Sequence, residues 1–450
     1  MRRGVFQTTL CIVFSVVVLA GSGCGRTNAA SPHATPRTSS SPTRLAQPTA
    51  PLSVYIGSTD GTVAALNAAS GTLRWRSVVA SSASTTTVAA LAEGAVYVSA
   101  TNVNKHPLTT YLAALRASDG SVLWHATLAG AAAVVATGPG VVYLAFSGDG
   151  TNPHEMQMLR AEDGAVVWRT QVEGAGPLHA SMHEGTIYVT SFTTQLPSPG
   201  YYYASTIVYA LDASTGAVSW RTSIGRTNYL AEVAGGAVYL VDTGTDVVCD
   251  PHVLHVLGAS DGAERWHSKG TLLNLIGVEQ GRAYVAVVPE GCAALTYDHA
   301  PLSALNTGDG SKVWQIDVPS AFSGPLANGV IYVPGAGTVL AAYRARDGSR
   351  LWQVQGESGR LWILDAGLYT SVAGQGLDAL DPATGAVRWR YRPGDDVSLS
   401  TIANGILYGI SSRQITGSSR NQAIVALTTS NGKLLWTFQI GTSDDTPIVG

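Results

Sequence analysis

The sequence predicts an all-β protein built from one repeated unit, and three observations support this prediction. A segment with Gly four residues before Trp occurs nine times, and the copy from Ile207 to Arg221 reads IVYALDASTGAVSWR. A short, mostly apolar run that ends in Tyr precedes each copy, so Tyr and Trp alternate nine times. From Trp75 to Trp436 the mean period is about 45 residues, the length of a four-stranded propeller blade. We therefore expect a single closed β-propeller.

The repeat tryptophans are expected to be structural. They are Trp75, Trp124, Trp168, Trp220, Trp266, Trp314, Trp352, Trp389 and Trp436. One four-stranded sheet of this length cannot bury both faces alone, so the blades should stack face to face around an axis. The Gly in each polar turn supplies the positive φ of a tight hairpin. Each Trp then fills space between adjacent blades, where burying an indole removes roughly 150 to 250 Å² from water.

Residues 1–24 have the pattern of an export signal. Arg2 and Arg3 precede an apolar segment, Leu10–Ala20, that is too short to span a bilayer. The sequence GSGC24 follows, and the whole segment resembles a bacterial lipoprotein signal peptide. This resemblance implies that Cys24 is the lipid-modified first residue of the mature chain. Gly21 departs from the apolar residue usual at its position, so an ordinary secretory signal cut nearby is the alternative.

Two further parts are expected after the signal. Residues 25–52 are mainly Ser, Thr, Pro and Ala, which cannot bury enough surface to fold, so we predict a flexible tether. Residues 53–450 contain no further linker and no helical period, so the uninterrupted repeat predicts one domain. Removing Arg2 and Arg3 with the signal lowers the net charge from −3 to −5. Without a basic face, nucleic acid is not an expected partner.

The two ends of the repeat region are expected to meet. The chain stops 14 residues after Trp436, before another Tyr strand could form. We therefore predict that the C-terminal segment TPIVG450 pairs beside the strand that contains Tyr55. This pairing would close the ring and leave no free sheet edge there.

The units resemble the pyrroloquinoline quinone (PQQ) type repeat of quinoprotein alcohol dehydrogenases and of the outer-membrane barrel-assembly lipoprotein. The segments LDASTGAVSW220 and LDPATGAVRW389 carry the repeat signature, and the resemblance covers residues 53–450. It implies a propeller that usually has eight blades. Because nine units are counted here, either the ring has nine blades or one unit is degenerate or packed outside it. The repeat marks blade packing rather than chemistry.

We expect no enzymatic activity and no catalytic, cofactor or metal residues. The resemblance implies that a dehydrogenase of this family would need adjacent cysteines, calcium ligands and a catalytic aspartate. This chain has no Cys-Cys dipeptide and no C-x-x-C-H haem attachment. A PQQ-dependent oxidoreductase with a divergent site, binding PQQ and calcium, is the alternative.

Cys249 and Cys292 occupy similar places in the loops of neighbouring units. In an exported protein such a pair predicts a disulfide. The alternative is a metal site of Cys249, His252 and His255, although an i, i+3 pair on a strand points to opposite faces. The stretch SGDGTNPHE155 offers oxygen donors for calcium, but a single Asp in a Gly-rich turn is more often only a turn.

The distance from Tyr to Trp indicates where loops are long. It is 20 residues in units one, seven and eight, and 25 to 32 in the other six. We expect the additions between the second and third strands of each blade, on one face of the ring. Tyr201, Tyr202 and Tyr203 form the candidate contact loop, because tyrosine offers a large area and a hydrogen-bonding tip. The alternative is that they only pack this loop onto its neighbours.

Together these features predict a non-enzymatic propeller, lipid-anchored to a bacterial membrane outside the cytoplasm. It would bind another envelope protein or a surface ligand through the long loops of one face. The alternatives are the PQQ-dependent oxidoreductase and an outer-membrane protein assembly factor.

Overall fold

The protein was analysed as a computed structural model that describes most of residues 52–450. The described ranges are 52–80, 84–102, 108–148, 153–195, 203–225, 228–242, 253–268, 271–288, 300–319, 324–335, 339–355, 359–416, 419–441 and 446–450. They belong to one compact unit, Leu52–Gly450. Every regular element in these ranges is a β-strand, so the predicted all-β class is confirmed. None of the described residues forms a helix that could cross a bilayer.

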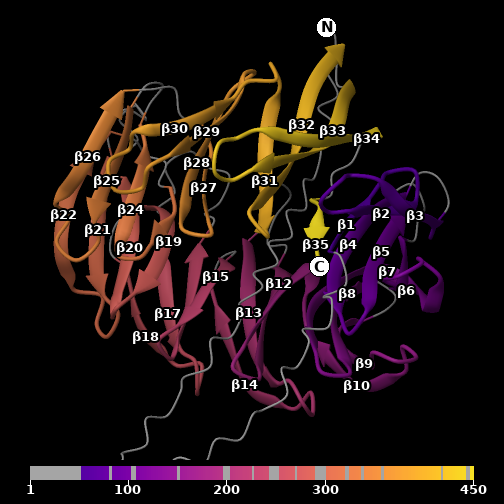
Figure 1. Cartoon of the computed structure of the whole chain (residues 1–450). Helices are drawn as coiled ribbons and strands as arrows, with labels where there is room; N and C mark the ends of the chain where they lie inside the picture. The colour runs from indigo at the N-terminus through magenta and orange to yellow at the C-terminus, as the bar shows by residue number, and fades with distance from the viewer. Residues whose placement is uncertain are drawn as a thin grey trace, which may run out of the picture. The chain divides into compact units, whose positions relative to one another are not determined.

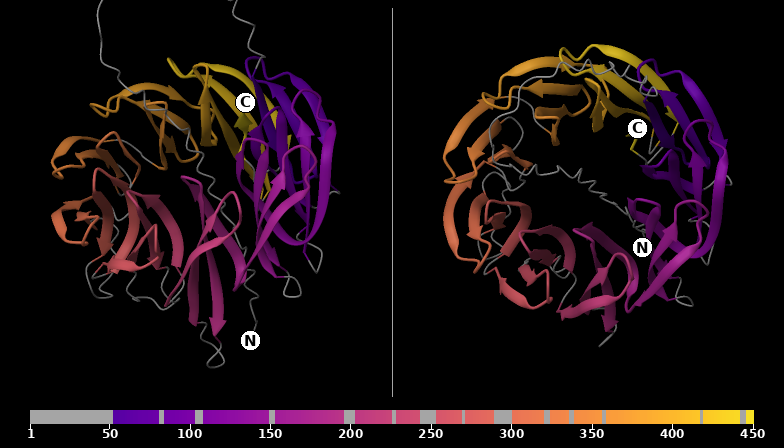
Figure 2. Two further views of the ribbon diagram at one scale, coloured as in Figure 1. Left: turned by 90° about the horizontal axis from the view of Figure 1, so that it is seen from below. Right: turned by 60° about the horizontal axis from the view of Figure 1, so that its bottom comes forward.

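The strands form nine antiparallel four-stranded units that follow one another around a circle (Figures 1 and 2). Unit one contains β35 (Ile448–Val449), β1 (Ser53–Gly57), β2 (Thr62–Asn67) and β3 (Leu73–Val78). Unit two contains β4 (Ser84–Ala92), β5 (Ala95–Asn102), β6 (Thr109–Arg116) and the first half of β7 (Val122–Gly138). Unit three contains the second half of β7, β8 (Val141–Gly148), β9 (His154–Arg160) and β10 (Val166–Val172). Units four to six contain β11 (Ala175–His183), β12 (Thr186–Gln195), β13 (Tyr203–Asp212), β14 (Val218–Ile224); β15 (Asn228–Ala234), β16 (Ala237–Asp242), β17 (Leu254–Gly258), β18 (Glu264–His267); and β19 (Thr271–Glu279), β20 (Arg282–Val288), β21 (Ala300–Asn306), β22 (Lys312–Val318). Units seven to nine contain β23 (Leu326–Ala327), β24 (Val330–Pro334), β25 (Val339–Arg344), β26 (Arg350–Gln355); β27 (Leu361–Leu364), β28 (Gly367–Val372), β29 (Gly376–Leu380), β30 (Val387–Tyr391); and β31 (Asp396–Ala403), β32 (Ile406–Thr416), β33 (Ser419–Thr428), β34 (Leu434–Gly441).

Units two and three share the long strand β7, which makes their two sheets continuous. Its first half, Val122–Ala129, pairs with β6, and its second half, Gly130–Gly138, pairs with β8. The change of partner falls at Gly130, whose φ of 144° lies outside the range that other residues prefer. Nine units are therefore present among the described residues, each with its own Trp. The structure therefore has nine units rather than the eight blades that the resemblance implied, and none of the nine is degenerate.

Each repeat Trp joins its unit to the next one along the chain. Its indole Nε1 donates a hydrogen bond of 2.8–3.2 Å to a carbonyl oxygen in the polar turn of the next unit, and this contact recurs at all nine junctions. In eight units, all but the fifth, the Trp ring also lies against the Tyr of its own unit, with centroids 5.8–6.3 Å apart. The Trp and Tyr rings thus pack together at a junction, and the Trp indole supplies its hydrogen bond.

The ninth unit contacts the first in the same way. Trp436 Nε1 and the Tyr408 hydroxyl both donate to the carbonyl oxygen of Ala68, at 3.0 Å each. The predicted pairing of the C-terminal segment is also confirmed, since β35 pairs antiparallel with β1 (Figure 1). Backbone hydrogen bonds between Ser53 and Gly450 continue this pairing.

The polar turn before each Trp is closed by an acidic or amide side chain at one of two positions, and the turn of unit six uses both, because Asn306 also accepts the backbone N–H of Gly308. In three units an Asn or Asp four residues before the Gly accepts backbone N–H groups of the turn: Asn67, Asp212 and Asp381. In the other six, the residue just before the Gly accepts the N–H of the residue after it: Asp119, Asp163, Asp261, Asp309, Asp347 and Asn431. These side chains satisfy donors that the tight turn leaves unpaired.

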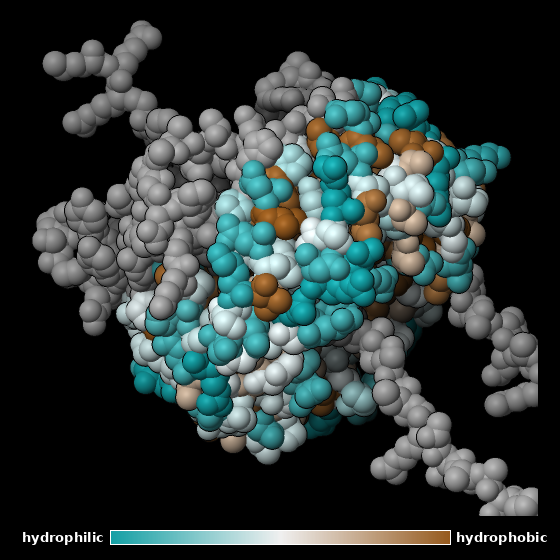
Figure 3. All heavy atoms as spheres, turned by 90° about the vertical axis from the view of Figure 1, so that its left-hand side faces the viewer, coloured by the Kyte–Doolittle hydropathy of each residue, from teal (hydrophilic) through white to brown (hydrophobic). Residues whose placement is uncertain are grey.

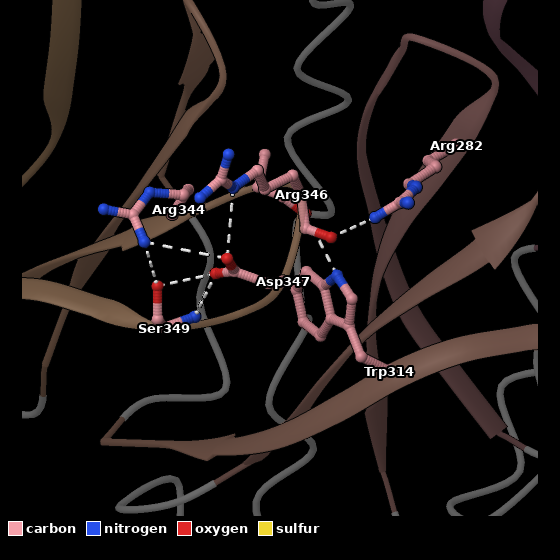
Figure 4. A network of polar contacts seen from close by, with 7 residues as sticks. Arg282, Trp314, Arg344, Arg346, Asp347 and Ser349 are labelled. Atoms are coloured by element: carbon pink, nitrogen blue, oxygen red, sulfur yellow. Dashed lines mark hydrogen bonds and ion pairs between the residues drawn. The ribbon is translucent and has the colours of Figure 1, made fainter.

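Figure 4 shows one junction with its turn. Hydrogen bonds from the Ser349 side chain and backbone hold the pKa of the Asp347 carboxyl well below its usual range. Beside this turn, Trp314 Nε1 donates to the carbonyl oxygen of Ala345, and Arg282 Nη1 donates to that of Arg346. The turn therefore carries its own internal hydrogen bonds and presents its carbonyl groups to the preceding unit.

The outermost strands expose apolar residues one or two positions before the Trp. Examples are Val313, Leu351 and Val387, each 39–46% exposed. On the side of the molecule in Figure 3, hydrophobic residues occur as separate spots among hydrophilic ones. Scattered apolar residues of this kind are normal on soluble proteins and do not by themselves indicate a binding surface.

Close packing of Trp on the next turn predicts that the turn glycines are less replaceable than other glycines with positive φ. Gly262 (φ 66°) lies against Trp220, and a Cβ atom there would overlap the indole ring. Gly185 (φ 78°) has open space around it. We expect Gly185→Ala to lower the free energy of unfolding by about 1 kcal/mol, the cost of the left-handed backbone alone. Gly262→Ala should cost about 1–3 kcal/mol more, because the core is overpacked.

Chemical denaturation of the two variants beside the unmodified protein measures this difference. If both variants lose the same free energy of unfolding, the close contact of Trp220 with Gly262 does not restrict the residue at position 262.

Candidate functional site

The long hairpins lie where the Tyr-to-Trp spacing predicted them, between the second and third strands of their units. They connect β5 to β6, β8 to β9, β12 to β13, β16 to β17, β20 to β21 and β32 to β33. In unit one the corresponding turn is tight, and Asp60 closes it by accepting the N–H and hydroxyl of Thr62. We call the end of the ring that carries these connections the long-hairpin end.

The connections between successive units lie at the same end. Val79 and Ala80, which follow β3, donate backbone hydrogen bonds to Gly61 in the β1–β2 turn. Gly394, which follows β30, donates to the carbonyl oxygen of Gln375 in the β28–β29 turn. One end of the ring therefore carries both sets of connections, as expected from the sequence.

Among the described residues, two hairpins at this end have longer paired strands than the others. Strands β12 and β13 pair without interruption from Thr186↔Asp212 to Gln195↔Tyr203. Strands β32 and β33 pair from Ile406↔Thr428 to Thr416↔Ser419. By contrast, β28 and β29 pair only as far as Val372↔Gly376. The fourth and ninth units therefore extend hydrogen-bonded ribbons beyond the tight turns of units one, seven and eight, and the ribbon of the ninth unit has a register shift between Gln414 and Thr416.

The base of the ninth-unit hairpin is fixed to the connection that precedes its unit. The Asp395 carboxylate, 15% exposed, lies 2.6 Å from Arg413 Nε and accepts a hydrogen bond of 3.0 Å from the Ser411 hydroxyl. Arg413 and Ser411 are on β32, whereas Asp395 lies between β30 and β31. A partly buried pair with a second hydrogen bond holds its geometry better than an exposed ion pair would.

The base of the fourth-unit hairpin is fixed in a similar way. Glu173, in the connection before β11, donates its backbone N–H to the Tyr209 hydroxyl at 3.0 Å. Its carbonyl oxygen accepts a hydrogen bond from Ser191, and its carboxylate lies 2.5 Å from Arg221 Nη2. Ser191, Tyr209 and Arg221 come from three successive strands of the unit. Both long hairpins thus rise from bases that are hydrogen-bonded to the preceding connection.

Several residues singled out in the sequence lie outside the described ranges. Cys24, Tyr201, Tyr202, Cys249 and Cys292 are among them. The lipid anchor and the disulfide therefore stay predictions. Tyr203 is the first residue of β13, and its backbone pairs with that of Gln195. The contact role of the tyrosine loop stays a prediction as well.

His255, part of the alternative metal site, has other partners. Glu264 Oε1 lies 2.9 Å from His255 Nδ1 and 3.2 Å from His267 Nδ1. The hydrogen bond to His255 lowers the pKa of the Glu264 carboxyl. His252 lies outside the described ranges. Within those ranges, no group of three or more His, Cys, Asp or Glu side chains is arranged to hold a metal ion.

A half-buried carboxyl in the fifth unit was not singled out from the sequence. Burial raises the pKa of Glu232, and a backbone hydrogen bond from Val278 offsets part of this effect. Glu232 pairs across the sheet with Tyr239, whose buried hydroxyl has no hydrogen-bond partner in the described residues. Burial, with a smaller contribution from Glu232, raises the pKa of Tyr239 to about 12. The sequence signal that could have identified Glu232 is an acidic residue within a strand whose apolar residues alternate.

The comparisons with known proteins place these observations in a family. A profile described as "Outer membrane protein assembly factor BamB" matches residues 59–152, 154–269 and 249–391. No curated protein matches the chain. Among solved structures, BamB from Moraxella catarrhalis is 15% identical, with a TM-score of 0.43 over 71% of this chain and 92% of that one. Quinohemoprotein alcohol dehydrogenase from Comamonas testosteroni is 16% identical, with a TM-score of 0.41 over 74% and 71% of the two chains. A computationally designed protein, Ika8, is 9% identical, with a TM-score of 0.47 over 68% and 87%.

The raised pKa of Glu232 predicts a pH-dependent effect on stability. Because its carboxyl has a higher pKa in the folded than in the unfolded protein, its contribution favours folding at low pH and is lost as the pH rises through the folded pKa. Glu232→Gln should therefore raise the melting temperature at pH 8, and the gain should shrink as the pH is lowered to 4.

Thermal melts of both proteins across this pH range measure the effect. Glu184→Gln is the matched control, because the Glu184 side chain is 88% exposed and should leave the melting temperature unchanged at every pH. If Glu232→Gln raises the melting temperature by the same amount at every pH, the raised pKa of Glu232 would be contradicted.

Proposed function

The chain belongs to the family described as outer membrane protein assembly factor BamB, and on that premise we propose that it is an envelope scaffold. In this proposal it is lipid-anchored outside the cytoplasm of a bacterium and binds another envelope protein through its long-hairpin end. It has no catalytic role and needs no cofactor.

The observation that carries the proposal is the contrast between the two long hairpins and the uniform ring beneath them. All nine junctions repeat one contact, whereas among the described residues the β12–β13 and β32–β33 ribbons have the longest pairing and are fixed at their bases. Binding residues on proteins usually lie on loops that a rigid scaffold positions. Because the strands of these ribbons are already paired, a partner can bind them with little loss of conformational entropy.

The family description favours a more specific form of this function. It names assembly of outer membrane proteins, so we propose that form as the second candidate. A PQQ-dependent oxidoreductase stays the alternative from another class, and it rests on the repeat resemblance alone.

The membrane attachment rests on the sequence of residues 1–52. A lipid on Cys24 would hold the propeller at a membrane, and the Ser/Thr/Pro/Ala-rich tether would let it reach partners. We expect Cys24→Ala to move the protein from the membrane to the soluble fraction. Cell fractionation with immunoblotting measures this, with a Cys249→Ala variant as control. Retention of Cys24→Ala in the membrane would contradict the anchor.

Site-specific photo-cross-linking in the native host tests the binding surface. A photoreactive residue at position 201 should give adducts with an envelope protein. The control position is 184, in the β11–β12 turn at the opposite end of the unit, and it should give none. Replacing Tyr201, Tyr202 and Tyr203 together by Ser should lower recovery of the same partner about tenfold or more.

Adducts formed equally from both positions, or from position 184 alone, would contradict binding at the long-hairpin end. If the partner belongs to the machinery that inserts β-barrel proteins, and their amounts fall when the gene is deleted, the assembly role is supported over a general scaffold.

A further inference from the structure

The end of the ring opposite the long-hairpin end carries two turns from each of units two to nine. One turn joins the first strand to the second, and the other is the polar turn before the Trp. Backbone hydrogen bonds connect the two turns within a unit, for example from the Ala117 N–H to the Gly94 carbonyl oxygen at 2.8 Å and from the Ala161 N–H to that of Gly140 at 2.9 Å. We call this end the polar-turn end.

In unit one the chain enters the ring at the polar-turn end. The first strand of this unit, β35, is the end of the chain, so no turn joins it to β1. Leu52 takes the place of this turn, because its carbonyl oxygen accepts a hydrogen bond of 3.0 Å from the N–H of Ala68, the residue equivalent to Ala117. The predicted tether therefore joins the ring at this end.

Charge is distributed unevenly over the polar-turn end. The nine-residue segments that end in the repeat Trp have a summed formal charge of +4 in units six to nine and one, and of −3 in units two to five. The turns between the first and second strands add Arg282, Glu279 and Asp365 to the first group, and Glu93 and Glu184 to the second. One half of this end therefore carries +3 and the other half −5, which the net charge of the whole chain conceals.

Unit seven is the most positive part of this end. Its segment RARDGSRLW352 contains Arg344, Arg346 and Arg350 with one carboxylate, Asp347, so its formal charge is +2, whereas the other eight segments lie between −1 and +1. Figure 4 shows Arg344 and Arg346 around Asp347. Arg282 of unit six also reaches this turn, where its Nη1 donates to the Arg346 carbonyl oxygen (Figure 4).

Two of these arginines are not needed for the turn. Unit two has the nearly identical segment RASDGSVLW124, in which Ser118 and Val122 stand where unit seven has Arg346 and Arg350. The two turns have the same internal hydrogen bonds. In both, the Asp accepts the backbone N–H and the hydroxyl of the Ser that follows the Gly, and the first Arg donates to that hydroxyl. Arg346 and Arg350 are thus additions to a turn that forms without them.

Both added arginines are exposed and keep most of their donors available. The Arg346 side chain is 72% exposed, and its Nε lies 3.2 Å from Asp347 Oδ2. Arg350 Nη1 donates a hydrogen bond of 2.8 Å to Gln353 Oε1. A guanidinium group has five N–H donors and binds phosphate oxygens well. The two side chains can therefore contact an anionic surface without breaking the bonds that hold the turn.

We propose that the positive half of the polar-turn end lies against anionic phospholipid headgroups, with Arg346 and Arg350 among the contacting residues. This inference rests on the membrane attachment in the proposed function. Cationic side chains near an anionic leaflet are attracted to it, and the attraction falls off within a Debye length. The contact orients the anchored ring, so that the long-hairpin end faces away from the membrane and toward envelope partners.

The place where the chain enters the ring favours a membrane over an acidic protein as the occupant of this surface. A lipid on Cys24 and a tether that joins the ring at the polar-turn end bring this end nearest to the bilayer. Unit one, where the tether joins, belongs to the positive half. The acidic half is repelled by the same leaflet, so the ring should tilt toward its positive half.

Co-sedimentation with vesicles tests this surface on the full-length Cys24→Ala protein, which lacks the lipid. Vesicles of phosphatidylcholine with about one third phosphatidylglycerol should bind it at low ionic strength, whereas vesicles of phosphatidylcholine alone should not. Raising the ionic strength from about 0.01 M to about 1 M should abolish binding, because the Debye length falls from roughly 30 Å to roughly 3 Å. The same screening explains why this contact does not replace the anchor.

Arg346→Ser combined with Arg350→Val gives unit seven the turn residues of unit two at these positions, so the ring should keep its melting temperature. This variant should bind the anionic vesicles about tenfold or more weakly, since each arginine near an anionic surface contributes to binding. The matched control is Arg160→Gln combined with Arg265→Gln, which removes two exposed arginines from the acidic half. It should change binding by less than about twofold.

Three results would overturn the proposal: no binding to the anionic vesicles, equal binding to both kinds of vesicle, or an equal loss for both pairs of substitutions. If the unit-seven variant binds vesicles normally but recovers less of an envelope protein from the native host, an acidic protein occupies the surface instead, and the proposal is wrong. Cell fractionation and cross-linking from position 201 do not depend on these arginines. A failed vesicle test therefore leaves the proposed function standing.

Discussion

The structure depends on one repeated contact, in which the Trp of one unit packs on the turn Gly of the next and bonds to a carbonyl group of that turn. The contact combines a large apolar area with a directional hydrogen bond, so it fixes both the spacing and the orientation of neighbouring units. The turn must be rigid for this to work. An Asp or Asn cap supplies that rigidity, and every unit has such a cap in at least one of two positions.

Because every junction is the same, the number of copies sets the number of units. The resemblance implied eight blades, but nine complete copies give nine junctions, and Trp436 bonds to unit one as each other Trp bonds to its successor. The C-terminal strand β35 completes the first unit, so the edge of β1 is covered by the end of the chain. A ring of identical contacts tolerates variation elsewhere, and the variation is confined to hairpin length and to a few positions between units.

The departures from the repeat are therefore where function is to be sought. The fourth and ninth units carry long ribbons whose bases are tied down by Glu173 and Asp395. The eighth unit has Thr370 and Asp378 where the first unit has Ile56 and Ala64, and the Asp378 carboxylate forms ion pairs with Arg390 and Arg392.

The sequence by itself determined the strands, the repeat, the position of the long hairpins and the pairing of the chain ends. These features follow from local periodicity, from turn chemistry and from counting residues between Tyr and Trp, none of which needs coordinates. The tertiary structure decided which side chains meet. In every unit a bulge just before the Trp shifts the register of the outer strand, so the neighbour of Asp378 could not be read from spacing alone. Leu340 and Val354 of the seventh unit line the same groove as Arg390 of the eighth, and these residues come together only when the two sheets stack.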